Sequence, residues 1–109
     1  MKRKSKAQSE MIERISDMEQ KFDSAREALA RLRDAVDGYR GISGCISELS
    51  DYYSGSWKGD FLADENGELP PDLKRGVLSE DGLWNFFEEN RELAEELAAL
   101  SAEMNDISL

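Results

Sequence analysis

The stretch MIERISDMEQKFDSAREALARLRDAVDGY, residues 11–39, decides the fold. Neither proline nor glycine interrupts it before Gly38, and Ser9 with Glu10 offers a start for a helix. The apolar residues of this stretch recur in alternating steps of four and three residues over about four heptads, and we call this row of residues the first seam. Such a row is typical of one long helix that faces a partner helix. We therefore predict a helix over roughly residues 8–38. The first seam consists of Met11, Ile15, Met18, Phe22, Ala25, Leu29, Leu32, Val36 and Tyr39.

Three glycines follow the first seam, at Gly38, Gly41 and Gly44. Glycine costs about 1 kcal/mol at a helix-interior site, so three at this spacing predict a helix end and a turn. A shorter apolar pattern over residues 42–53 then predicts a second, short helix. Residues 54–78 are rich in turn residues and predict an irregular, ordered connector. Within it, a hairpin at Asn66–Gly67 is the weaker alternative, because the flanking residues are poor strand formers.

The last predicted helix begins at Ser79, a good N-cap residue followed by two acidic residues. Asn90 occupies one slot of its seam, where it either fixes the register or bonds to the backbone of the middle segment. We predict an all-α fold, in which two long antiparallel helices, a shorter helix and an aromatic-rich connector form a small helical bundle. The second seam consists of Leu83, Phe86, Leu93, Leu97, Leu100 and Met104 beside Asn90.

Length and composition limit the possible functions. The 109 residues suffice for one domain, which we place at residues 8–109 after a basic flexible tail, residues 1–7. A net charge of −10 argues against direct nucleic-acid binding. The chain lacks histidine and carries one cysteine, Cys45, which is most simply a core residue. We therefore expect no histidine-dependent catalysis, no metal and no cofactor, and hence no enzyme.

Nothing in the sequence resembles a targeting segment. The N-terminus is basic, but no apolar stretch of signal-peptide length follows it. No run approaches the roughly 20 apolar residues that a membrane span requires. A cytoplasmic location, where thiols stay reduced, is the expectation, and it suits an unpaired cysteine.

The last helix is strongly acidic, because residues 79–109 carry nine acidic residues against Arg91 alone. The simplest interpretation is a solvated outer face. An alternative is that this face occupies the basic groove of a nucleic-acid-binding enzyme, as a phage anti-defence inhibitor would. A third is that the basic tail lies along it. The acidic residues that we take as candidates for partner binding are Glu88, Glu92, Glu95 and Glu96.

Most of the aromatic residues gather between Tyr52 and Phe87. They are expected to form a small core that closes one end of the helical pair, or else a binding patch, since exposed tryptophan and tyrosine anchor interfaces. Two adjacent basic residues beside them predict a local positive spot. The candidates for partner binding in this region are Tyr52, Tyr53, Trp57, Trp84, Lys74 and Arg75.

These observations favour a non-enzymatic module for protein–protein interaction, which acts through its helical seams and its aromatic end. Two broad apolar stripes exceed what one small hairpin buries, so a homodimer is one possible assembly. The alternative is the acidic inhibitor described above. The partner is expected to be a protein, with neither nucleic acid nor membrane bound directly.

Several segments resemble the domain-of-unknown-function family 4298 over roughly residues 9–100. They are MIERI (11–15), LSDYY (49–53), Trp57, Asp60, Asp64 and above all LPPDLKRGVLSED (69–81). The resemblance implies a short, acidic, helical bacterial protein without an established activity, cofactor or catalytic residue. The basic tail and Gly82 depart from the family pattern.

Overall fold

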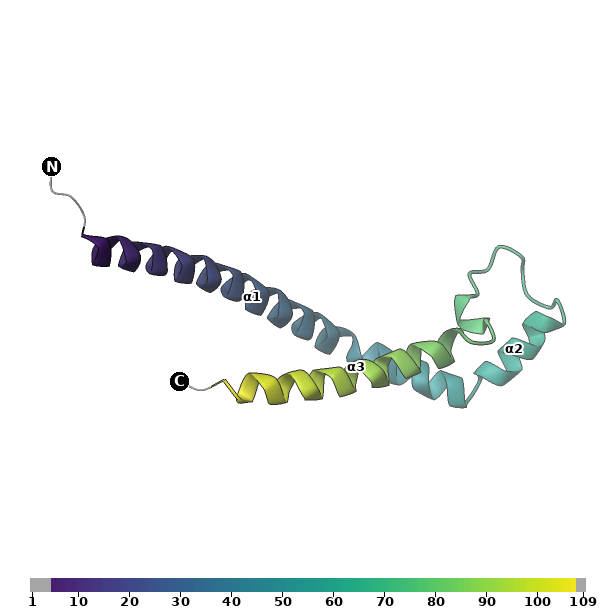
Figure 1. The fold of residues 1–109 in the computed structure, drawn as a ribbon. Coiled ribbons are helices and arrows are strands. Elements are labelled where there is room, and N and C mark those ends of the chain that lie inside the picture. The colour runs from purple at the N-terminus through teal and green to yellow at the C-terminus, as the bar shows by residue number, and fades with distance from the viewer. Residues whose placement is uncertain (1–4, 108–109) are drawn as a thin grey trace. The chain divides into compact units, whose positions relative to one another are not determined.

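The computed structural model describes residues 5–107, and every regular element among them is helical (Figure 1). The elements are α1 (Lys6–Ser54), α2 (Trp57–Glu65), the 3₁₀ turn η1 (Gly76–Leu78) and α3 (Gly82–Asn105). The predicted all-α class is therefore confirmed. No described helix contains a stretch long and apolar enough to cross a membrane.

The chain divides after Gly44 into two compact units, and α1 runs through the boundary. The first unit ends at Gly44 and the second begins at Cys45. The two seams lie in different units, so the predicted antiparallel packing of one on the other stays a prediction. In the first unit the seam is exposed, with Phe22 at 56% and Leu29 at 51% of full exposure.

The start of α1 corrects the prediction at Ser9. Ser5 and Gln8 form a reciprocal capping box, in which the Gln8 amide donates to Ser5 Oγ at 3.1 Å and the Ser5 amide donates to Gln8 Oε1 at 3.0 Å. Lys6 consequently lies in the first turn of α1 and not in a separate tail. The rest of the predicted basic tail, residues 1–4, lies outside the described residues.

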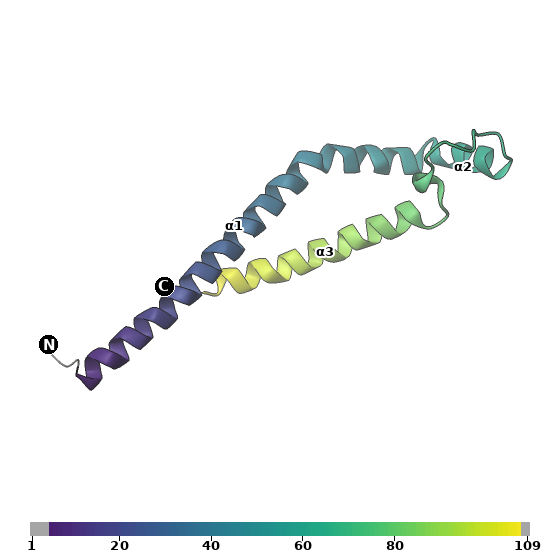
Figure 2. The ribbon, with the colours of Figure 1, turned by 90° about the horizontal axis from the view of Figure 1, so that it is seen from above.

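The predicted break at the three glycines is wrong, because α1 continues through them for 49 residues in total (Figure 2). The short helix predicted over residues 42–53 is therefore the last part of α1. The helical phase explains the continuity: Tyr39, Ile46 and Tyr53 follow one another at intervals of seven residues. A cost of about 1 kcal/mol per glycine weakens a long helix without ending it when good helix formers lie on both sides.

The connector contains a helix, α2, that its sequence pattern did not predict. Trp57 and Phe61 are four residues apart and stack with their ring centroids 5.0 Å from each other, which supports the two turns of α2. Gly67 ends this helix with φ +71°, and its amide and that of Glu68 donate to the carbonyls of Asp64 and Ala63, each at 3.0 Å. This is a Schellman motif, so Asn66–Gly67 ends a helix and turns no hairpin.

The third helix begins two residues later than predicted. Asp81, and not Ser79, is the N-cap residue of α3. Ser79 follows η1, and its hydroxyl donates to the Gly76 carbonyl at 3.0 Å. A Cβ at Gly82 would lie 2.3 Å from Ser79 Oγ and 3.0 Å from the Gly76 oxygen, so this tight entry into α3 favours glycine.

Candidate functional site

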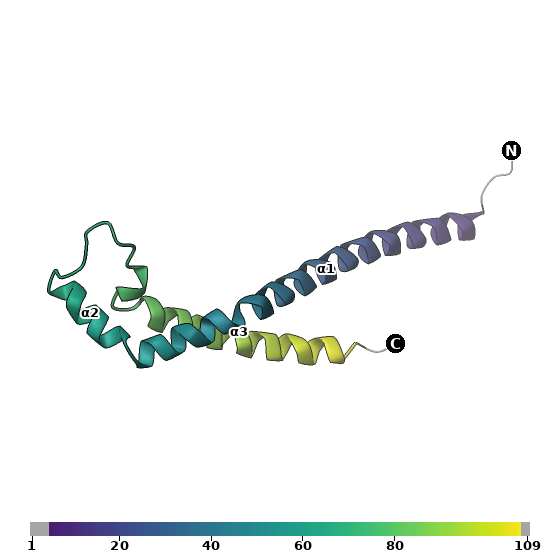
Figure 3. The ribbon, with the colours of Figure 1, turned by 180° about the vertical axis from the view of Figure 1, so that it is seen from behind.

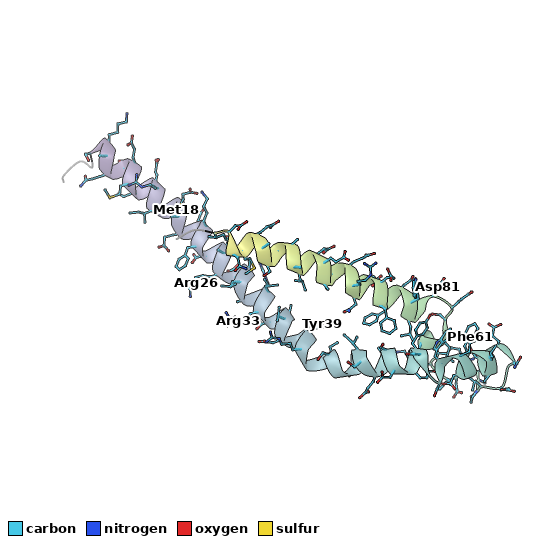
Figure 4. All side chains as sticks on the ribbon, turned by 90° about the horizontal axis from the view of Figure 1, so that it is seen from below. Met18, Arg26, Arg33, Tyr39, Phe61 and Asp81 are labelled. Carbon is cyan, nitrogen blue, oxygen red and sulfur yellow. The ribbon has the colours of Figure 1, made fainter. Side chains whose placement is uncertain are left out.

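The second unit carries a cluster of aromatic rings at the point where α1 ends and α3 begins. Tyr53 from α1 lies 5.0 Å from Trp57 of α2 and 5.8 Å from Phe87 of α3, measured between ring centroids. Phe61 stacks on the far side of Trp57, and Phe86 meets Phe87 edge-on at 5.6 Å. We call these five residues the aromatic cluster; Figure 4 labels Phe61 within it. The cluster confirms that the aromatic residues of three segments gather together.

One hydrogen bond joins the connector to this cluster, and two buried leucines lie at its end. The indole Nε1 of Trp57 donates to the Val77 carbonyl at 2.7 Å, which joins α2 to η1. Leu78 and Leu83 are the buried hydrophobic side chains among residues 5–107, at 7% and 6% exposure. Figure 3 shows the connector returning from the end of α2 to the start of α3. Trp57 is thus a structural member of the cluster as well as a candidate contact.

The two adjacent basic residues have different surroundings. Arg75 forms an ion pair with Asp64, donates to the Pro70 carbonyl, and donates through Nε to the Leu73 carbonyl at 3.2 Å. Its side chain is 33% exposed and that of Asp64 is 21% exposed. Lys74 is exposed and forms no ion pair with any residue of the described chain. Arg75 therefore holds the connector together, and of these two residues it is Lys74 whose charge is left without an ion pair.

Tyr52 lies next to the aromatic cluster and is held by a carboxylate. Its hydroxyl donates to Asp60 Oδ2 at 2.7 Å, which joins α1 to α2. Partial burial, and then the hydrogen bond and charge of Asp60, raise the pKa of the Tyr52 phenol to about 12. Tyr52 is therefore neutral at physiological pH and acts here as a hydrogen-bond donor.

The remaining candidates lie on α3. Trp84 is 55% exposed although its neighbour Leu83 is buried, so its ring is available to a partner. Arg91 binds Glu88 at 2.7 Å and Glu95 at 2.9 Å, and these carboxylates raise its pKa. Glu92 and Glu96 are exposed and take part in none of the ion pairs found in residues 5–107.

Three partners at this site were not predicted from the sequence. They are Asp60 for Tyr52, the Val77 carbonyl for Trp57, and Asp64 for Arg75. For the ion pair of Asp64 with Arg75 the sequence offers one signal, because these opposite charges lie on either side of the turn at Pro70–Pro71. No group of three or more cysteine, aspartate or glutamate residues within residues 5–107 is placed to hold a metal ion.

The chain matches the family described as Domain of unknown function (DUF4298) over residues 15–100. The chain belongs to this family. The DUF4298 match begins in the first seam of α1 and continues through the aromatic cluster to Leu100 of α3, so it covers the whole candidate site. The chain matches no curated protein and no solved structure at a significant level.

Proposed function

We propose that this DUF4298 protein is a non-enzymatic bacterial module for protein–protein interaction, which works in the cytoplasm through its two seams and its aromatic end. The exposure of the seams carries the proposal. Met11, Ile15, Met18, Phe22 and Leu29 of the first seam are each about half exposed, as are Leu93 and Met104 of the second. Contiguous apolar stripes of this kind mark interaction surfaces on soluble domains.

The aromatic end supplies a second contact region. Tyr53 packs on both Trp57 and Phe87, which holds these rings in place and leaves little side-chain entropy to lose on binding. Trp84 projects beside them with more than half of its surface exposed. Tryptophan is enriched among the residues that dominate binding energy at interfaces, so Trp84 is the anchor that we assign to this end.

Quantitative capture from a bacterial lysate tests the proposal. Phe22→Ser with Leu29→Ser removes two exposed apolar side chains of the first seam, and we expect at least about a tenfold loss of captured partner. The matched control, Glu27→Ser with Asp34→Ser, changes two exposed residues elsewhere on the same helix and should leave capture unchanged. Capture that persists undiminished in the seam variant would refute the proposal.

The acidic inhibitor is the second candidate, and the charge of α3 supports it. Arg91 is paired with Glu88 and Glu95, while four further glutamates of α3 take part in no ion pair of the described chain: Glu89, Glu92, Glu96 and Glu103. Binding to a basic groove would weaken steeply with salt, as binding by nucleic acid does. Changing Glu88, Glu92, Glu95 and Glu96 to glutamine should then abolish binding, and retention of binding would exclude this candidate.

A further inference from the structure

The two seams are flanked by charges of opposite sign. On α1, Arg26, Arg33 and Arg40 each follow directly after a seam residue, at heptad position e. On α3, three glutamates at the same seven-residue interval each come directly before a seam residue, at heptad position g. All six side chains are exposed, and the ion pairs among residues 5–107 include none of them. Figure 4 labels Arg26 and Arg33 on α1. The three glutamates are Glu89, Glu96 and Glu103.

Orientation decides whether these charges can meet. In a parallel pair of helices, position g of one helix faces position e of the other, and such pairs set partner choice and orientation. In an antiparallel pair, e faces e and g faces g. An antiparallel pairing would therefore set the arginines of α1 beside Phe87, Ala94 and Ser101, the e positions of α3. It would set at most two of the glutamates beside Arg14 and Lys21, the basic g positions of α1, so it joins fewer opposite charges than a parallel pairing does. The charge pattern favours a parallel pairing of α1 with α3.

One register satisfies all six charges. It places Glu89 beside Arg26, Glu96 beside Arg33 and Glu103 beside Arg40. The seam residues then meet in apolar layers, with Leu93 opposite Ala25, Leu97 opposite Leu29, Leu100 opposite Leu32 and Met104 opposite Val36. A shift by one heptad in either direction keeps only two of the three charge pairs, and one of these shifts sets Glu89 beside Glu19.

A single chain cannot form this parallel pair. In the required register Phe87 lies level with Glu19, but the ring of Phe87 is already packed on Tyr53, 5.8 Å between centroids. Glu19 and Tyr53 are about 34 residues apart on one helix, so no turn of α3 can lie beside both. The α3 that pairs with a given α1 in parallel must come from another copy.

Pairing between identical helices is less favourable. Two α1 helices in parallel gain an attraction between Arg14 and Glu19 but set Lys21 beside Arg26. Two α3 helices in antiparallel orientation set glutamate against glutamate. Only the parallel pairing of α1 with α3 sets each of the three arginines beside a glutamate.

We propose that the partner of these seams is a second copy of this chain, in a reciprocal dimer in which each α3 lies parallel to the partner's α1. Both copies offer the same two surfaces, so a two-fold axis closes the assembly and leaves neither seam open for further growth. This inference rests on the proposed function and names the partner for the seams. The aromatic end and Trp84 stay free for a different protein.

Charge reversal with exchange of partners tests the dimer. The acidic-α1 variant carries R26E, R33E and R40E, and the basic-α3 variant carries E89K, E96K and E103K. Sedimentation equilibrium gives the dimer dissociation constant of each. Each variant alone should self-associate at least about tenfold more weakly than the wild type, because the charges that flank the α1 seam then face charges of the same sign on α3. An equimolar mixture should form a heterodimer of nearly wild-type affinity, because both of its interfaces are again complementary.

The controls separate pairing from bulk charge and from folding. E13K, E27K and D34K produce the same change in net charge at exposed positions of α1 that face away from the seam, and this control variant should dimerise as the wild type does. Far-UV circular dichroism should report equal helicity for all variants, since every substituted side chain is exposed. Equal weakening in the control variant would overturn the proposal.

Two further outcomes would overturn the second copy as partner. One is a wild type that stays monomeric at all concentrations. The other is failure of the mixture to associate while a chain carrying all six substitutions behaves as the wild type, which would place the pairing within one chain. Neither outcome decides the proposed function, because the lysate capture with the Phe22 and Leu29 variant measures that independently.

Discussion

Replacing Trp57 with alanine should loosen the whole aromatic end. The change removes two ring contacts, with Tyr53 and Phe61, and the hydrogen bond from Nε1 to the Val77 carbonyl. Ring pairs of this geometry contribute about 0.5–1.5 kcal/mol each, and a hydrogen bond about 1 kcal/mol. We therefore expect the local free energy of opening of residues 45–105 to fall by about 3 kcal/mol. Only Leu78 and Leu83 are buried among the described hydrophobic side chains, so little else compensates.

Amide hydrogen exchange read by mass spectrometry measures this local opening. A loss of about 3 kcal/mol corresponds to roughly a 100-fold loss of protection in peptides that cover α2 and η1. Trp84→Ala is the matched control, because the same chemical change at a 55% exposed ring should alter protection by less than about threefold. The reasoning fails if Trp84→Ala costs as much as Trp57→Ala, or if Trp57→Ala leaves the protection of η1 unchanged.

Three further predictions follow from the backbone, the connector and the titration of Tyr52. Gly41→Ala should stabilise α1 by up to about 1 kcal/mol, since a Cβ at this position meets nothing within 4 Å. Gly67→Ala should destabilise the end of α2, because the backbone there has φ +71°. Thermal unfolding followed by circular dichroism measures whether each variant is more or less stable than the wild type. Arg75→Met should cost about 1–2 kcal/mol in urea unfolding and Lys74→Met less than about 0.5 kcal/mol, and equal costs would contradict the role of the arginine in holding the connector together. The phenol pKa of Tyr52 is raised above its ordinary value of 10.0 to about 12, so its contribution to stability is complete below pH 10 and is lost as the pH rises toward 12. The urea midpoint of the wild type should exceed that of Tyr52→Phe by an amount that shrinks across this interval. A difference that stays constant would be inconsistent with the Tyr52 hydrogen bond.

Much of the helical organisation was predictable because it depends on local periodicity. The first seam and the second seam predicted two long helices, and α1 and α3 contain them. The ends of helices were less predictable. The capping box of Ser5 and Gln8 is a local signal that was overlooked in favour of Ser9. The three glycines were given more weight than the phase of the residues beyond them.

The candidate site was predictable in its membership but not in its bonding. The positions of the aromatic residues along the sequence, between Tyr52 and Phe87, predicted that they would gather, and five of these rings do so. The same reasoning treated Arg75 and Lys74 as equivalent, although one is bound to Asp64 and the other is exposed. Adjacent residues differ in this way because a side chain's partner depends on the path of the backbone. The connector is irregular, so no repeating residue pattern predicts that path.

By itself the amino-acid sequence determined the helical class, the two seams and the opposite charges that flank them, because these properties follow from the 3.6-residue period of the helix and from residue type. The tertiary structure alone decided which carbonyl receives the indole hydrogen of Trp57 and which carboxylates bind Tyr52 and Arg75. Those contacts join residues 8 to 20 positions apart across turns, where no repeating pattern specifies a partner and only the folded backbone brings donor and acceptor together.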